Sequence, residues 1–280
     1  MASNIAGLGP AANQSILRAM NRNNQELGDT LEKIASGHRI IHASDDAAGL
    51  AIANQLDAQI RSLSQAERNS QNAIGVTQVA EGGLNTIGDL LMRVRELSVQ
   101  GSDDEIDNNE RDLINTEKDQ LIAEIDRTAK TSQYLGHSLL SGDKDLHFNV
   151  GIHQGADNVL VYPGSQADLT ASGLGVSSVS LDSPDSAVDA VEKADQAFDK
   201  VNHLRAQLGG LQTRLLANMD NLDVYRGALA GVKSGIQDAD LAQESTKLVS
   251  EQIQRVASIA VLSQANALST QVLRLIEPLV

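Results

Sequence analysis

Apolar residues recur in two long ladders, one in each half of the chain, at alternating steps of three and four positions. The first ladder runs from Leu63 to Val94 and the second from Val201 to Ala239, where Asn218 is the polar exception. Such spacing is typical of a coiled-coil seam, in which a stripe on one helix packs against a stripe on another. A chain that folds back on itself supplies one partner stripe and leaves its other apolar faces for neighbouring molecules. The pattern therefore predicts a mainly α fold of long antiparallel helices in a coiled-coil-like bundle, and it favours assembly over catalysis.

One short segment between the ladders changes from helical to strand periodicity. Apolar residues occupy every second position from Leu146 to Ile152, and a second apolar run extends from Val159 to Tyr162 after a turn. This pattern predicts one small β-hairpin, which must lie against the helices because an isolated hairpin is unstable in water. The following residues, 164 to 183, are rich in Ser, Gly and Ala and are expected to form a linker.

The boundaries of the helices follow from caps and breaks. A helix is expected from Pro10 towards Ala43, with an interruption at Gly37, and the next helix is expected to begin at Ser44 because serine is a favourable N-cap. A later helix start is expected at Pro184, since proline suits the first helical position. In chain order, the resulting division is a terminal helix (1–43), flanking helices (44–138), a β-hairpin with a linker (139–183), one long flanking helix (184–237) and a second terminal helix (238–280).

Composition and charge exclude several classes of protein. The chain has three Tyr, two Phe, and neither Trp nor Cys, so it offers few aromatic core residues and no thiolate ligands. Its net charge is −15, yet residues 1–44 sum to +1 and residues 241–280 to zero, so the acidic charge lies between them. An acidic chain with few aromatic residues does not suit nucleic acid. No continuous apolar stretch predicts a membrane span, and the amino-terminal residues do not resemble an ordinary secretory signal.

Candidate reactive groups are few. His38 and His42 stand four positions apart but lack a third ligand, and the acidic run from Asp103 to Glu110 lacks the glycine and terminal glutamate of a calcium loop. No phosphate loop, nucleophile elbow or zinc-protease motif occurs, so we expect no cofactor and no enzymatic activity. Glycines at 227, 231 and 235 form a stripe without side chains, which favours the close approach of another backbone.

Five ordered motifs resemble those of one protein family. The run IASGHRIIHASDDAAGLAIA, from Ile34 to Ala53, closely resembles the amino-terminal signature of bacterial flagellins. The next two motifs, MRVRELSVQ from Met92 and EIDR from Glu124, follow in the family's order. Two further runs, IQDAD from Ile236 and LSQAN from Leu262, are similar to the carboxy-terminal signature of the same family. The resemblance covers nearly the whole chain.

The resemblance implies a structural subunit of the extracellular flagellar filament used for swimming. In that family the two terminal segments pair as a helical coiled coil that lines the inner tube, and the long helices with the hairpin form the surrounding shell. Residues 139–183 leave no room for large outer domains, so the resemblance implies a short flagellin. The side chains expected to pack in the inner tube during polymerisation are Ile16, Leu27, Leu31, Ile34, Leu248, Ile253, Val256 and Leu262.

The resemblance also implies partners. Flagellins are exported unfolded through the flagellar type III apparatus, an export chaperone holds the carboxy-terminal segment, and the filament meets cap and hook-associated proteins. The flagellin-sensing Toll-like receptor reads a helical patch that alignment places at Arg93, Leu97 and Glu117.

Two alternatives compete with the filament subunit. A hook-filament junction protein shares related ends and a similar size, although the DDAAG and SQAN runs favour the filament subunit. A flagellin carrying an inserted protease would need a catalytic insert between the halves, for which residues 139–183 are too short.

Overall fold

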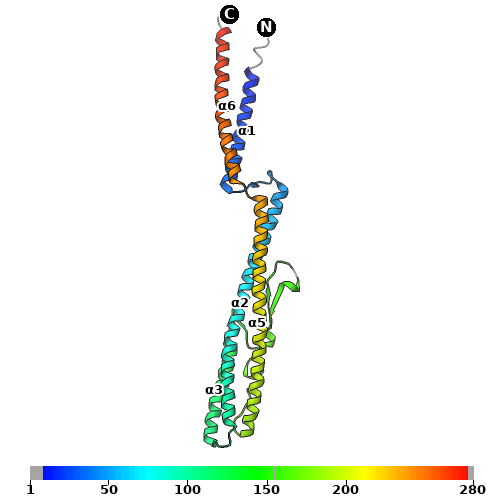
Figure 1. Ribbon diagram of the computed structural model, residues 1–280, viewed down its shortest axis with the longest axis vertical. Helices are drawn as coiled ribbons and strands as arrows, with labels where there is room; N and C mark the ends of the chain where they lie inside the picture. The colour runs from blue at the N-terminus through cyan, green and yellow to red at the C-terminus, as the bar shows by residue number, and fades with distance from the viewer. Residues whose placement is uncertain (1–8, 154, 277–280) are drawn as a thin grey trace. The chain divides into compact units, whose positions relative to one another are not determined.

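The computed structural model describes residues 9–153 and 155–276, and it confirms a mainly α fold with small antiparallel strand pairs (Figure 1). The extreme ends of the first and last expected segments, 1–8 and 277–280, lie outside the described residues. The chain forms two compact units. Unit 1 combines residues from 1–58 with residues from 229–280, and unit 2 contains residues 59–228.

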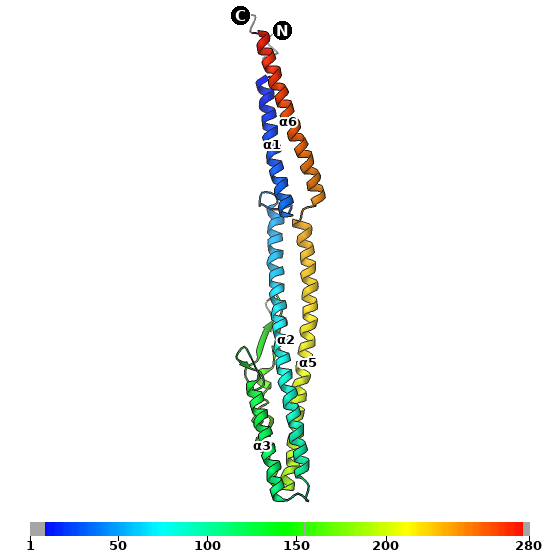
Figure 2. The ribbon, with the colours of Figure 1, turned by 90° about the vertical axis from the view of Figure 1, so that its left-hand side faces the viewer.

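Unit 1 is built around two helices from opposite ends of the sequence. Helix α1 spans Gly9–Ser36 and helix α6 spans Leu241–Ile276, and the two lie side by side in both views (Figures 1 and 2). The Asn23 amide donates to Gln254 Oε1 at 3.3 Å, and the Thr30 hydroxyl donates to Glu251 Oε1 at 3.1 Å. Because later residues of α1 meet earlier residues of α6, the pair is antiparallel.

The loop after α1 is folded by two aspartates. The Asp45 carboxylate accepts hydrogen bonds from the backbone amides of Ile41 and His42 at 3.1 and 3.0 Å, and Asp46 Oδ1 accepts one from the Gly49 amide at 2.9 Å. Helix α2, Ala47–Gly101, therefore begins after Asp46, and the expected start at Ser44 was wrong. The hydrogen bonds to Asp45 hold residues 41–45 in a turn before the helix. Asp46, rather than Ser44, therefore caps the first free amides of the helix.

Unit 2 contains most of α2, helix α3 (Asn108–Thr131) and most of helix α5 (Pro184–Gln237). The first ladder is confirmed as the inner face of α2, since every member from Leu63 to Val94 is buried. Its Ser70 and Thr77 hydroxyls donate to carbonyls of their own helix, which satisfies them inside the core.

The second ladder is buried over only part of α5. Within unit 2, Val201, Leu204, Leu208, Leu211, Leu215 and Leu222 are buried. The polar member, Asn218, donates its side-chain amide to the Val150 carbonyl at 3.0 Å. Asn218 therefore binds the backbone of Val150, the residue that follows β3. This contact is a physical reason for a polar residue in the apolar seam.

Two antiparallel strand pairs lie between α3 and α5 in the sequence. The expected hairpin is present as β3 (Leu146–Asn149) and β4 (Val159–Tyr162), with Leu146 opposite Tyr162. A second, shorter pair that the periodicity did not predict joins β1 (Gln133–Tyr134) to β2 (His137–Ser138). Two-residue strands are too short to show an alternating pattern.

The segment expected to be a linker is part of the core of unit 2. Residues 164–183 contain the 3-10 turn η3 (Gly164–Gln166) and the short helix α4 (Ala171–Leu174). Within the segment, Leu169, Leu174, Val176 and Leu181 are buried, and the buried Lys118 ammonium donates to the Val179 carbonyl at 2.5 Å. The linker prediction was wrong because the apolar residues among the Ser and Gly pack against the helices.

Candidate assembly surfaces

The contact between α1 and α6 mixes apolar and polar layers. Leu27 is buried and Ile16 and Ile34 are half-buried on α1, and Leu248 and Leu262 are half-buried on α6. The polar members Asn23, Thr30 and Glu251 are buried among them. Five of the eight side chains expected to pack during polymerisation are therefore buried or half-buried: Ile16, Leu27, Ile34, Leu248 and Leu262.

The other three expected side chains lie exposed on the same two helices. Leu31 is 49% exposed, Ile253 64% and Val256 68%. On α6, Val249, Ile253, Val256 and Ala260 recur at steps of four, three and four and are all exposed. We call this set the outer stripe.

The outer stripe faces away from α1. Residues two positions apart on a helix point about 200° apart, and Val249 and Val256 each lie two positions before a residue of low exposure, Glu251 and Ser258. Helix α6 therefore carries one stripe that meets α1 and an apolar stripe on the opposite face that water covers in this chain.

The far end of the second ladder is partly exposed, since Leu229, Ile236 and Ala239 are only half-buried. Val232 is 53% exposed, and Tyr225 is exposed although Leu222, one turn earlier, is buried. Apart from the backbone of α5 itself, no described atom lies within 4 Å of an added Cβ at Gly227, Gly231 or Gly235. The close backbone approach expected at this glycine stripe is not made within the described chain.

The two signature segments meet in unit 1. The Arg39 amide donates to the Gln237 carbonyl at 2.7 Å, and the Ala239 amide donates to the Gly37 carbonyl at 2.9 Å. His38 Nδ1 lies 3.2 Å from Asp238 Oδ1, so this histidine belongs to a loop contact. The hydrogen bonds from the His42 and Ile41 amides lower the pKa of the Asp45 carboxyl, because they stabilise its charged form.

The three residues expected to meet an immune receptor differ in exposure. The Arg93 guanidinium donates to Glu117 Oε1 from two nitrogens at 3.0 and 2.8 Å, and it also reaches Glu96 at 3.0 Å. The hydrogen bond to Glu117, with a smaller contribution from Glu96, raises the pKa of Arg93. Leu97 is 1% exposed and lies in the core of unit 2. Arg93 and Glu117 therefore form a surface pair above a residue that a partner cannot touch directly.

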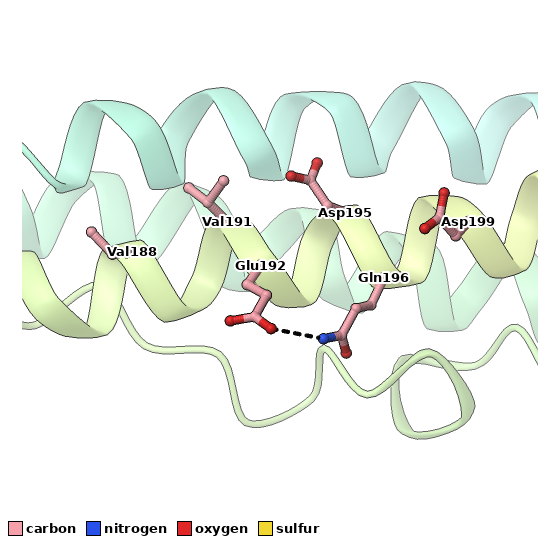
Figure 3. A pocket seen from close by; sticks show the side chains of 6 residues that line it. All are labelled: Val188, Val191, Glu192, Asp195, Gln196 and Asp199. Atoms are coloured by element: carbon pink, nitrogen blue, oxygen red, sulfur yellow. Dashed lines mark hydrogen bonds between the residues drawn. The ribbon is translucent and has the colours of Figure 1, made fainter.

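Open grooves run along the long helices of unit 2. One of about 500 Å³ lies along α5 and is lined by Val188, Val191 and four polar side chains (Figure 3). Glu192 accepts a hydrogen bond from the Gln196 amide at 3.2 Å, and Asp195 pairs with Arg95 at 2.6 Å. The groove is thus lined by exposed carboxylates, two of which already bind neighbouring side chains of this chain.

The described residues hold neither a metal-binding cluster nor a membrane-spanning helix. No group of three or more His, Cys, Asp or Glu side chains there is placed to hold a metal ion. No helix within the described ranges has a stretch apolar and long enough to cross a lipid bilayer.

Two family models match the chain on either side of its central hairpin. The bacterial flagellin N-terminal helical region matches residues 10–145, and the bacterial flagellin C-terminal helical region matches residues 191–276. The chain belongs to the bacterial flagellin family. The five motifs that suggested this family fall inside the two matched regions.

Curated relatives match along almost their whole length. The chain is 35% identical to the flagellar filament 33 kDa core protein of Treponema phagedenis, over 92% of this chain and 95% of that protein. It is 36% identical to a flagellin of Halalkalibacterium halodurans, over 88% and 90% of the two chains. Since these relatives have nearly the same length, the chain is a short flagellin without a large outer domain.

A solved structure supports the fold. A putative flagellar hook-associated protein from Vibrio parahaemolyticus matches with a TM-score of 0.57 and 14% identity, over 69% of this chain and 100% of that chain. At this identity the similarity concerns the architecture alone. The sequence relatives decide between the two candidate functions, and their names are those of filament proteins.

The chain is thus a structural subunit of the bacterial flagellar filament, in a family whose members polymerise with copies of themselves. That family forms the extracellular filament and is a structural one. The sequence interpretation missed the polar contacts of Asn23, Thr30 and Glu251. Their signal was available, because Asn23 and Thr30 continue the heptad spacing of Ile16, Leu27 and Ile34.

Proposed function

We propose that unit 1 makes the contacts that polymerise this chain, and that the outer stripe of α6 packs against neighbouring copies in the inner part of the filament. The observation that carries the proposal is the second apolar stripe on α6, opposite the face that meets α1. Exposed apolar stripes of this length mark association surfaces, because burying them is favourable and leaving them in water is not.

The charge of the terminal segments supports the same arrangement. Residues 1–44 sum to +1 and residues 241–280 to zero, whereas the whole chain carries −15. Copies can therefore bring these ends together with little mutual repulsion. Leu31 on α1 and the exposed ladder end around Val232 on α5 extend the apolar surface available to them.

The partners beyond other copies follow from the same surface and from the family. An export chaperone that holds the α6 segment would cover the residues of the outer stripe until the unfolded chain enters the flagellar type III apparatus. Filament cap and hook-associated proteins meet the two ends of the polymer. For the flagellin-sensing Toll-like receptor, the accessible candidates are Arg93 and Glu117, since Leu97 is buried.

A charge placed in the outer stripe tests the polymerisation surface. Val256→Asp is expected to raise the critical concentration for filament formation at least tenfold, because a carboxylate cannot be buried unpaired in an apolar contact. Ultracentrifugation and electron microscopy of the full chain measure the effect. The matched control is Ser250→Asp, which adds the same charge at an exposed polar position of α6.

The two variants must differ for the proposal to stand. Thermal unfolding of unit 2 is expected to be the same in both, since neither position belongs to it. If Val256→Asp sediments as filaments at the wild-type concentration, the outer stripe is not a polymerisation surface.

A further inference from the structure

The turn between β1 and β2 contains a residue that is unfavourable in two ways. Leu135 has a φ of 49°, and it is the one described residue other than glycine with a positive φ. It is also 86% exposed, more than any other large apolar side chain described. A Cβ atom disfavours the left-handed region, and an isobutyl group in water gains nothing there.

The geometry of the turn explains the strain. Tyr134 pairs with His137, so Leu135 and Gly136 are the two central residues, with φ values of 49° and 82°. Positive φ at both positions is the type I′ turn, which strongly favours Asn or Asp followed by Gly. Leucine is therefore a poor choice for the turn, and most of its side chain stays in water in the single chain.

A groove that suits a leucine side chain lies elsewhere in unit 2. It has a volume of about 380 Å³ between α2 and α5, and its lining includes the buried Leu91 and Ala194, the half-buried Phe198 and the exposed Met92. The Arg95 to Asp195 ion pair, 2.6 Å long, joins the two helices at the same groove. The groove thus offers an apolar lining and a paired charge at its edge.

The turn and the groove are too far apart to meet in one chain. The Tyr134 ring lies over Gly75 of α2, 3.9 Å from the position of an added Cβ, and the groove is centred near Met92. These positions are 17 residues apart on one helix, which is about 25 Å at the rise of an α-helix. A second copy that lies beside the first, offset by about this distance in the direction of α2, can bring its turn to the groove.

We propose that Leu135 of one copy inserts into the α2/α5 groove around Met92 of the next copy. The proposal rests on the polymerisation of this chain and adds a contact made by unit 2. Each copy offers one turn and one groove at separate places, so the contact is heterologous and repeats without closing, as a filament requires. Burial of Leu135 in the polymer offsets the cost of leucine at a position where asparagine would relieve the strain.

Leu135→Asn separates assembly from folding. Asparagine tolerates positive φ, so the variant monomer is expected to unfold at the wild-type temperature or above it. Its critical concentration for polymerisation is expected to rise about tenfold, as measured by sedimentation. The control is Leu113→Asn, which removes an exposed leucine from α3 and is expected to leave the critical concentration unchanged.

Disulfide cross-linking identifies the groove, because the chain has no cysteine of its own. In the full chain carrying both Leu135→Cys and Met92→Cys, oxidation of filaments is expected to yield a ladder of covalent multimers on a non-reducing gel. The pair Leu113→Cys with Met92→Cys is the control and is expected to yield none.

The outcomes distinguish the two proposals. If wild-type protein forms filaments but Leu135→Asn polymerises normally, or if the ladder is absent, the Leu135 contact is wrong and the polymerisation proposal stands. A wild-type chain that stays monomeric under polymerising conditions overturns both.

Discussion

At the scale of single residues, two adjacent glycines on α2 have opposite requirements. A Cβ at Gly83 would lie 2.5 Å from Leu140 Cδ1 and 2.7 Å from Ser132 Oγ, whereas none of the described atoms lies within 4 Å of a Cβ at Gly82. Leu140 is fully buried and has no room to move away. Gly83 is thus the place where the segment after α3 approaches the helix.

Alanine at these two positions is expected to change stability in opposite directions. Gly83→Ala should lower the free energy of unfolding by about 1–3 kcal/mol through overpacking. Gly82→Ala should raise it by roughly 0.5–1 kcal/mol, because alanine favours the helix. Urea unfolding of the two variants measures both changes, and equal effects would show that the approach at Gly83 is not tight.

Tyr162 makes stability depend on high pH. Its side chain is fully buried, and its hydroxyl donates to the Leu139 carbonyl at 2.6 Å. Burial raises the pKa of Tyr162 well above its ordinary value of 10.0. The folded protein therefore keeps this proton at pH values where the unfolded chain loses it.

The sign of the effect follows from proton binding. The free energy of unfolding keeps its full value with respect to this group below pH 10. Above pH 10 it falls by up to about 1.4 kcal/mol per pH unit. At pH 8, Tyr162→Phe should cost about 1 kcal/mol, because the Leu139 carbonyl loses its donor. At pH 11 the deficit should shrink or reverse in urea unfolding. Tyr225→Phe, at an exposed tyrosine, is the control and should show no such change.

At the scale of elements, the α1/α6 pair is held by few apolar contacts and by polar contacts that are incompletely satisfied. Within the described residues, buried oxygens of Asn23, Glu244 and Glu251 have no hydrogen-bond partner. Glu251 does accept from Thr30, and Lys247 lies 3.8 Å from it. Polar layers of this kind reduce the stability of a coiled coil and can fix its register.

Removal of the Thr30 hydroxyl is expected to weaken this helix pair. Thr30→Val keeps the shape of the side chain but removes the hydroxyl that donates to Glu251. The free energy of opening the helix pair should fall by about 1–3 kcal/mol. Hydrogen exchange of the α1 and α6 amides should become faster by a corresponding factor. The control is Thr246→Val, whose hydroxyl donates only to the Ala242 carbonyl of its own helix. Similar exchange in the two variants would contradict a role for the Thr30 contact.

At the scale of the whole molecule, charge opposes assembly. Each copy carries −15, and the acidic charge lies between residues 45 and 240. Copies brought together through apolar ends must therefore place acidic segments near one another. Long-range repulsion of this kind is reduced by salt.

Polymerisation is accordingly expected to strengthen with ionic strength. Between about 10 and 150 mM salt, the screening length falls from about 30 to about 8 Å. The critical concentration measured by sedimentation should fall over this range. A critical concentration that rises with salt would indicate that attractive charge pairs dominate the contacts.

The sequence by itself determined the periodic elements and the family. The ladder from Leu63 to Val94 is buried at every position, and the hairpin appears at Leu146 and Val159, because burial of an alternating or heptad pattern fixes both the element and its inner face. The motifs from Ile34 and Ile236 identified the flagellin family for the same chain.

Only the tertiary structure decided which apolar faces find a partner within the chain. The periodicity of α6 does not distinguish Leu248, which faces α1, from Val256, which faces water, because both belong to apolar stripes of one helix. It also did not reveal that residues 164–183 enter the core or that Leu135 occupies a strained turn. Such outcomes depend on contacts between segments distant in sequence, which local spacing does not encode.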